Sequence, residues 1–160
     1  MNDKPSSPRT SAAPGPTLTP LSDDEAQAQL TQLGKAIVSA AQLQNVDAGF
    51  AFSSCNDQGD PPHQGSLEIG FTVPSGQSPD AYLNQVAAHM TSLGWVDGAP
   101  PGKTYVGKVL SMGGIAAQLR PPTVNDPKAV ISIDGECRNM TDHKTDGKGN
   151  GHDVTAEVTS

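Results

Sequence analysis

The side chains best suited to chemistry gather in two polar segments, each of which begins at a cysteine. One segment follows Cys55 and the other follows Cys137. Carboxylates and imidazoles transfer protons and bind metals, and amides and guanidinium groups bind polar ligands. The two segments supply all of these groups: Asn56, Asp57, Gln58, Asp60 and His63, then Arg138, Asn139, Asp142 and His143.

The cysteine pair is compatible with free thiols, a redox pair or a disulfide. A redox pair is normally a local Cys-x-x-Cys, whereas Cys55 and Cys137 lie far apart in the chain. Each follows a predicted strand, at the start of a polar loop, which suits a covalent link between two strand ends. We predict this disulfide, which stabilises by about 4 kcal/mol on the chain-entropy model and implies an oxidising compartment.

A Cys55–Cys137 bond brings the two polar segments to one edge of the domain. The simpler interpretation is structural: Asp57 or Asp60 pairs with Arg138, and the asparagines hydrogen-bond the turns that leave the strands. The other is a binding surface for a polar ligand or partner protein. It would consist of Asn56, Asp57, Asp60, His63, Arg138, Asn139, Asp142 and His143.

Metal binding and catalysis have little support in the residues. A zinc site built from His63, His143 and an aspartate would need two loops to place its ligands tetrahedrally, so we expect neither metal nor cofactor. The sequence lacks a Gly-x-Ser-x-Gly elbow, and a disulfide leaves no thiol nucleophile. Whether the protein is an enzyme stays open, with a non-enzymatic role favoured.

The elements that position these segments follow from local patterns. Ser22-Asp-Asp-Glu25 is a capping box that opens a helix over about 23–44, and Ser78 caps a second helix that Gly94 ends. Alternating apolar residues predict strands at 49–54, 67–73, 104–110, 115–120 and 128–136. The order α-β-β-α-β-β-β predicts an α+β fold, with a mainly antiparallel five-stranded sheet and both helices on one face.

Composition divides the chain into three parts. Residues 1–21, rich in Pro, Ser and Thr, are expected to be a disordered tether, 22–138 the α+β domain, and 139–160 a disordered polar tail. The net charge of −7 argues against nucleic acid as a partner and against binding to anionic membranes by charge alone. We expect a monomer.

The stretches SCNDQGDPPHQG around Cys55 and GECRNMTDH around Cys137 resemble motifs of a mycobacterial family of uncharacterised cell-envelope lipoproteins. The resemblance covers about residues 22–143. It implies export, an N-terminal lipid anchor and a disulfide-bonded domain in the cell envelope, but no activity. The sequence has neither the signal peptide nor the anchoring cysteine of that pattern. We therefore expect a removed signal sequence, with Met1 in the place of the lipid-modified cysteine.

Together these observations predict an exported, non-enzymatic envelope domain that binds a partner protein or an envelope lipid or glycan. Two alternatives remain. One is an envelope hydrolase with its site on the loops beside the disulfide, and the other is a lipid carrier with a cavity between sheet and helices.

Overall fold

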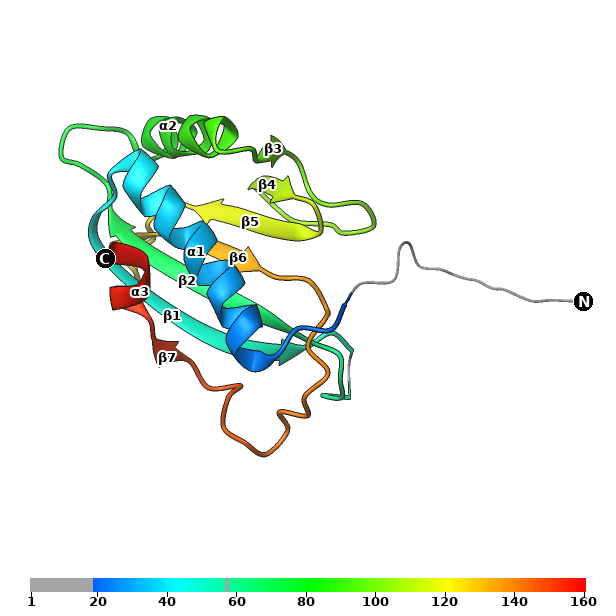
Figure 1. Ribbon diagram of the computed structural model, residues 1–160. Coiled ribbons are helices and arrows are strands. Elements are labelled where there is room, and N and C mark those ends of the chain that lie inside the picture. The colour runs from blue at the N-terminus through cyan, green and yellow to red at the C-terminus, as the bar shows by residue number, and fades with distance from the viewer. Residues whose placement is uncertain (1–18, 57) are drawn as a thin grey trace, which may run out of the picture.

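The computed structural model describes residues 19–56 and 58–160. One antiparallel sheet forms a layer, and helices lie across one of its faces (Figure 1). The elements are α1 (Asp23–Ala41), β1 (Gln44–Ser54), β2 (His63–Thr72), α2 (Pro79–Ser92), β3 (Val96–Asp97), β4 (Lys108–Met112), β5 (Ile115–Arg120), β6 (Ala129–Asp134), β7 (His152–Asp153) and α3 (Thr155–Thr159).

The sheet has the strand order β3-β4-β5-β6-β2-β1-β7, so β2 lies at its centre between β1 and β6. Every pairing is antiparallel. Strand β2 alternates as its sequence predicts: Leu67, Ile69 and Phe71 are fully buried beneath the helices, and Glu68 points to the opposite face. The α+β class and the antiparallel sheet are thus confirmed.

Helix α1 begins as the capping box predicts. The Ser22 hydroxyl accepts a hydrogen bond from the Glu25 amide at 3.1 Å, and the Glu25 carboxylate accepts one from the Ser22 amide at 2.9 Å. Further along, Gly34 lets α1 lie close to the sheet, since a Cβ there would be 2.8 Å from the Leu67 Cδ2 atom. None of the helices in the described ranges is long and apolar enough to cross a bilayer.

Several predicted details were wrong. The sheet has seven strands rather than five, because β3 and β7 have only two residues each and so give no alternation signal. Helix α1 ends at Ala41, earlier than predicted, because Gln42 takes a left-handed conformation with φ of 52°. The strand predicted at 104–110 is β4, Lys108–Met112. Gly94 has a φ of 109° and directly follows Leu93, the residue that caps α2.

The largest correction concerns residues 139–160, expected as a disordered tail. This segment runs beside β1 as β7 and ends in α3, which lies against α1 (Figure 1). Val154 and Val158 are 0% and 1% exposed and belong to the core. The Ala48 amide also donates to the Thr155 hydroxyl at 2.9 Å. Two buried valines and the hydrogen bonds to β1 thus hold this polar segment against the rest of the domain. The predicted tether, 1–21, falls largely outside the described residues.

Candidate functional site

A disulfide joins Cys55 to Cys137, as predicted. Cys55 follows β1 and Cys137 follows β6, the two strands that flank β2, so the bond lies across the start of β2. The Cα atoms are 6.2 Å apart, an ordinary separation for a disulfide. Both cysteines are exposed, and the polar loops that follow them therefore meet at one edge of the sheet.

Backbone hydrogen bonds tie these loops together. His63 and Asn139 exchange two of them, with N–O distances of 2.6 and 3.1 Å, so Asn139 continues the sheet beside the start of β2. The Leu21 amide donates to the Arg138 carbonyl at 2.8 Å. The Arg138 guanidinium in turn donates to the Thr19 carbonyl at 2.8 Å. The segment that leads into α1 is thus attached to the segment that follows the disulfide.

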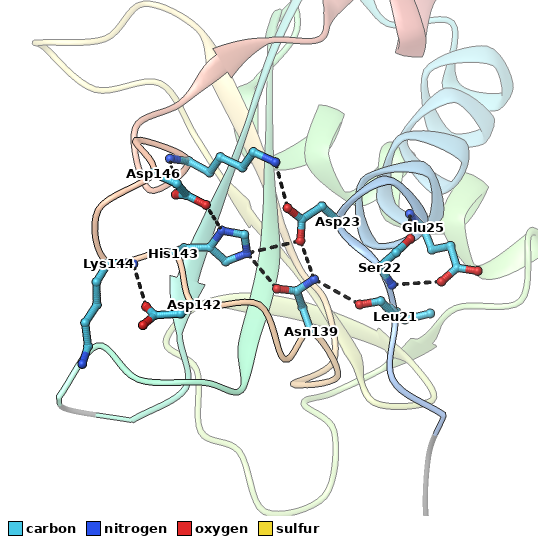
Figure 2. A network of polar contacts seen from close by, with 10 residues as sticks. Leu21, Ser22, Asp23, Glu25, Asn139, Asp142, His143, Lys144 and Asp146 are labelled. Atoms are coloured by element: carbon cyan, nitrogen blue, oxygen red, sulfur yellow. Dashed lines mark hydrogen bonds and ion pairs between the residues drawn. The ribbon is translucent and has the colours of Figure 1, made fainter.

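The Asn139 side chain is at the centre of a polar network (Figure 2). Its Nδ2 atom donates to the Leu21 carbonyl at 3.0 Å and to Asp23 Oδ1 at 2.9 Å. A backbone carbonyl only accepts, so this contact fixes the orientation of the amide and leaves Oδ1 as an acceptor. That Oδ1 atom lies 2.7 Å from His143 Nε2. Asn139 is 1% exposed, so all these contacts are shielded from water.

The His143 ring has an acceptor at each nitrogen. Nε2 donates to Asn139 Oδ1, and Nδ1 lies 2.7 Å from Asp146 Oδ2. Both ring nitrogens are therefore engaged by oxygen atoms of the chain itself. The ring stacks on Phe52 at 4.2 Å between centroids and meets His63 edge-on at 4.8 Å. With 2% of its side chain exposed, His143 is held in place from all these directions.

Asp23 supplies the main negative charge of the network. Its Oδ2 atom pairs with Lys148 Nζ at 2.8 Å. Burial by itself raises the pKa of the Asp23 carboxyl. Hydrogen bonds from Lys148 and Asn139 outweigh that effect, helped by one from Thr141 and by the nearby His143 ring, and they lower the pKa to about 2. The carboxylate is therefore ionised across the physiological range.

The remaining predicted residues divide between the loops. Asn56 shapes its own turn, since its Oδ1 accepts from the Gln58 and Asp60 amides at 2.9 and 3.2 Å. The predicted pairing of Asp60 with Arg138 is wrong, because Asp60 pairs with Lys144. This pairing and that of Asp23 raise the pKa of Lys144 and of Lys148.

Arg138 instead pairs with Glu136, at 3.0 Å. Asp142 caps its own loop, with its Oδ1 accepting from the Lys144 amide at 3.0 Å. Asp57, the other predicted partner of Arg138, lies outside the described residues.

The arrangement acts as an internal cross-link rather than as an open site. Within residues 19–56 and 58–160, no group of three metal-ligating side chains is placed to hold an ion, and the only buried side-chain polar atom without a partner is His63 Nδ1. The carboxylates and amides of the network bind each other, and the disulfide leaves no thiol. This edge therefore links the start of α1 to the segment that follows Cys137.

A second feature was missed by the sequence analysis. The face of the sheet that α1 leaves uncovered bears a groove of about 600 Å³ along β1, β2 and β6. Small residues at alternate positions of adjacent strands form its floor: Gly49, Ala51, Ser66 and Gly70. The sequence does place these small residues at the positions that alternate with the buried ones of both strands. Small side chains, however, have no functional groups that would mark them as a binding site.

Charged side chains surround this floor. Asp47, Glu68, Asp126 and Asp153 line the groove, and Lys128 is the one cation that its lining contains. Lys128 Nζ is 3.5 Å from Asp47 Oδ2 and donates to the Asn45 carbonyl at 2.6 Å. The groove is thus acidic, in keeping with the charge of the whole chain.

Fold and site together define a small disulfide-bonded α+β domain with an acidic groove on the bare face of its sheet. A family model described as "Putative lipoprotein LppJ" matches residues 22–157, and the chain belongs to this family. Proteins named "Putative lipoprotein LppJ" from Mycobacterium tuberculosis, strains CDC 1551 and H37Rv, and from Mycobacterium bovis AF2122/97 are each 45% identical over 141 residues. These matches span 88% of this chain and 71% of each relative. No solved structure matches.

The mycobacterial lipoprotein family inferred from the cysteine motifs is thereby confirmed. Membership in a family of lipoproteins indicates an exported, membrane-associated protein. A disulfide that persists in such a protein agrees with an oxidising environment.

Proposed function

We propose that this chain is the folded part of a cell-envelope lipoprotein and acts as a non-enzymatic binding module. Its ligand surface, on this proposal, is the groove on the bare face of the sheet. The observation that carries the proposal is the groove itself: about 600 Å³ across β1, β2 and β6, floored by small side chains. Volumes of this size are typical of ligand sites.

The shape of the groove favours an extended ligand. Gly49 and Ala51 lie on β1, and Ser66 and Gly70 on the adjacent β2, so the floor follows the direction of the strands. Gly70 also leaves room for a charged neighbour, since a Cβ there would lie 2.5 Å from Asp47 Oδ1. An extended chain laid along this floor would pass between the side chains at the margins of the groove.

The charge of the groove favours a basic segment of a partner protein. Four carboxylates line it against the single ammonium of Lys128. Glu68 is 66% exposed, and its pairing with Arg120 at 3.6 Å is weak in water. Carboxylates of this kind steer cations to a surface and select against anionic partners.

The edge beside the disulfide is less favoured as the ligand surface. Asn139 and His143 are buried there, and their polar atoms bind groups of the chain itself. The same observation weakens the hydrolase alternative, because the disulfide leaves no free thiol and the His143 ring nitrogens contact Asp146 and Asn139.

Site-specific photocrosslinking in mycobacterial cells tests the proposal. A benzophenone amino acid in place of Ala51 lies in the groove, whereas the same amino acid in place of Ser53 lies on the same strand and face but outside the lining. We expect a crosslinked protein at the first position only, joined through a Lys- or Arg-rich segment. Equal crosslinking at both positions, or a crosslinked segment without basic residues, would contradict the proposal.

A further inference from the structure

A second cleft lies at the other end of the sheet, between α2 and the strands β4 and β5. It has a volume of about 630 Å³ and shares no lining residue with the groove. Because β6 and β2 separate β5 from β1 in the sheet, this cleft and the groove occupy different parts of the molecule. The two cavities therefore have separate linings.

The cleft reaches the hydrophobic core. Leu83 of α2 and Leu119 of β5 line it, and these side chains are 3% and 2% exposed. Val106 and Pro121 add apolar surface to the lining, and Val106 is 85% exposed. Such an exposed valine next to a core-lined cleft offers apolar surface that a hydrocarbon chain would remove from water.

One cation in this cleft is available to a ligand. Three lysines, Lys35, Lys103 and Lys108, form no ion pair with another residue of 19–56 or 58–160. Lys35 and Lys103 are exposed and line neither cavity, whereas Lys108 is half-buried and lines the cleft. An ammonium beside apolar side chains gains more from an anionic partner than one surrounded by water does.

Two other charges line the cleft, and neither takes the place of Lys108. The Arg120 guanidinium is engaged with the Ser132 hydroxyl at 2.8 Å and with Glu68 at 3.6 Å. Asp80 lies in the first turn of α2, is exposed, and makes no ion pair within the described residues. An anion that binds Lys108 would be repelled by Asp80, which gives a second way to test the site.

We propose that this cleft binds a long-chain fatty acid. The carboxylate pairs with Lys108, and the hydrocarbon chain lies along Leu83, Leu119 and Val106. Both halves of the ligand then meet their complement: an ammonium that makes no ion pair with another described residue, and the exposed apolar surface of Val106 and Pro121 next to Leu83 and Leu119. This site is separate from the groove and from the partner protein proposed for it.

The test is an NMR titration of the full chain with dodecanoate, kept below its micelle concentration, and with dodecanol as the uncharged counterpart. We expect dodecanoate to shift the amide signals of Leu83 and Leu119 and to bind roughly tenfold more tightly than dodecanol. Unshifted cleft signals, or equal binding of acid and alcohol, would overturn the proposal.

Three variants sharpen the test. Lys108→Met keeps the aliphatic stem and removes the charge, and should weaken dodecanoate roughly tenfold while leaving dodecanol unchanged. Asp80→Asn removes the repulsion and should strengthen dodecanoate. Lys103→Met is the matched control, a neighbouring lysine outside the cleft, and should change nothing. Circular dichroism checks that each variant is folded. An equal loss of dodecanoate affinity in Lys103→Met and Lys108→Met would mean that Lys108 acts only through the overall charge, and would overturn the proposed pairing.

Discussion

Replacing Asn139 with aspartate is the sharpest perturbation of the polar network, because it changes one atom group and almost no volume. The Nδ2 atom that donates to the Leu21 carbonyl and to Asp23 becomes an oxygen. Two acceptors, at 3.0 and 2.9 Å, would then face a carboxylate oxygen in a site that is 1% exposed. Only the contact with His143 survives.

The expected loss follows from these contacts. The variant loses one hydrogen bond to a carbonyl and one to a charged carboxylate, and it places a second carboxylate beside Asp23. Polar groups left without partners in a buried site cost about 1–3 kcal/mol each, and here the Leu21 carbonyl and Asp23 Oδ1 would both lose the Asn139 donor. We therefore expect Asn139→Asp to lower the free energy of unfolding by about 3–5 kcal/mol at neutral pH.

The assay is urea unfolding followed by circular dichroism, with Asn56→Asp as the matched control. Asn56 lies in the loop after Cys55 and is exposed, and its Oδ1 acceptor contacts survive the change. Its Nδ2 contacts with the Asp60 and Pro61 carbonyls, at 3.1 and 3.4 Å, are lost, but in this exposed loop water can replace them. Asn56→Asp should lower the free energy of unfolding by less than about 1 kcal/mol. At about pH 5 the deficit of Asn139→Asp should narrow, because the new carboxyl gains a proton and can again donate.

Two results would refute this reasoning. One is a loss in Asn139→Asp no larger than in Asn56→Asp, which would mean that the network does not hold the ends of the domain together. The other is a deficit that grows as the pH falls toward 5, which would mean that the new carboxylate is not the source of the loss.

Three further predictions concern stability. The pKa of Asp23 is lowered to about 2 from 3.8, so the contribution of Asp23 to the free energy of unfolding, about 1–2 kcal/mol, is complete above about pH 4 and lost as the pH falls toward 2. Asp23→Asn should flatten this part of the curve of stability against pH. An unchanged curve would contradict the lowered pKa. The double variant Cys55→Ser, Cys137→Ser should lose up to about 4 kcal/mol of its free energy of unfolding, measured in urea, yet keep its far-ultraviolet circular dichroism spectrum. An unaltered urea midpoint would show that the disulfide does not stabilise the fold. Val158→Ala should lower the free energy of unfolding by about 2 kcal/mol, whereas the exposed control Val124→Ala should lower it by less than about 0.5 kcal/mol. Equal losses of stability would mean that α3 does not pack on the core.

The elements that sequence reasoning predicted well are those whose signals are local. The capping box at Ser22 and Glu25 needs only neighbouring residues, and the alternation through Leu67 and Ile69 marks β2 by itself. The N-cap at Ser78 was also confirmed, with its hydroxyl accepting from the Ala81 amide at 3.3 Å. In each case one short segment contains both partners of the interaction.

The C-terminal segment was missed because its stabilising contacts are distant in sequence. Val154 and Val158 stand four residues apart in a polar stretch, too few to mark a helix by periodicity. Their burial depends on α1 and β1. The hydrogen bond between Ala48 and Thr155 spans 107 positions, which no local pattern could reveal.

The disulfide edge was predicted in outline but not in its partners. Pairing Cys55 with Cys137 correctly brought the two loops together. Asp23, however, was considered only as part of the capping box, and Lys148 only as part of the disordered tail, although the two pair at 2.8 Å and link α1 to the C-terminal segment. The choice of Glu136 over Asp60 as the partner of Arg138 depends on loop conformations that composition does not encode.

The measurement that tests the proposed function most directly is an amide-resolved NMR titration with a short lysine-rich peptide, against a glutamate-rich peptide of equal length. We expect the lysine-rich peptide alone to shift the signals of Gly49, Ala51, Glu68 and Val130, and salt to weaken its binding. Equal responses to both peptides, or shifts confined to Asn56 and Asp60 beside the disulfide, would contradict the assignment of the groove as the ligand surface.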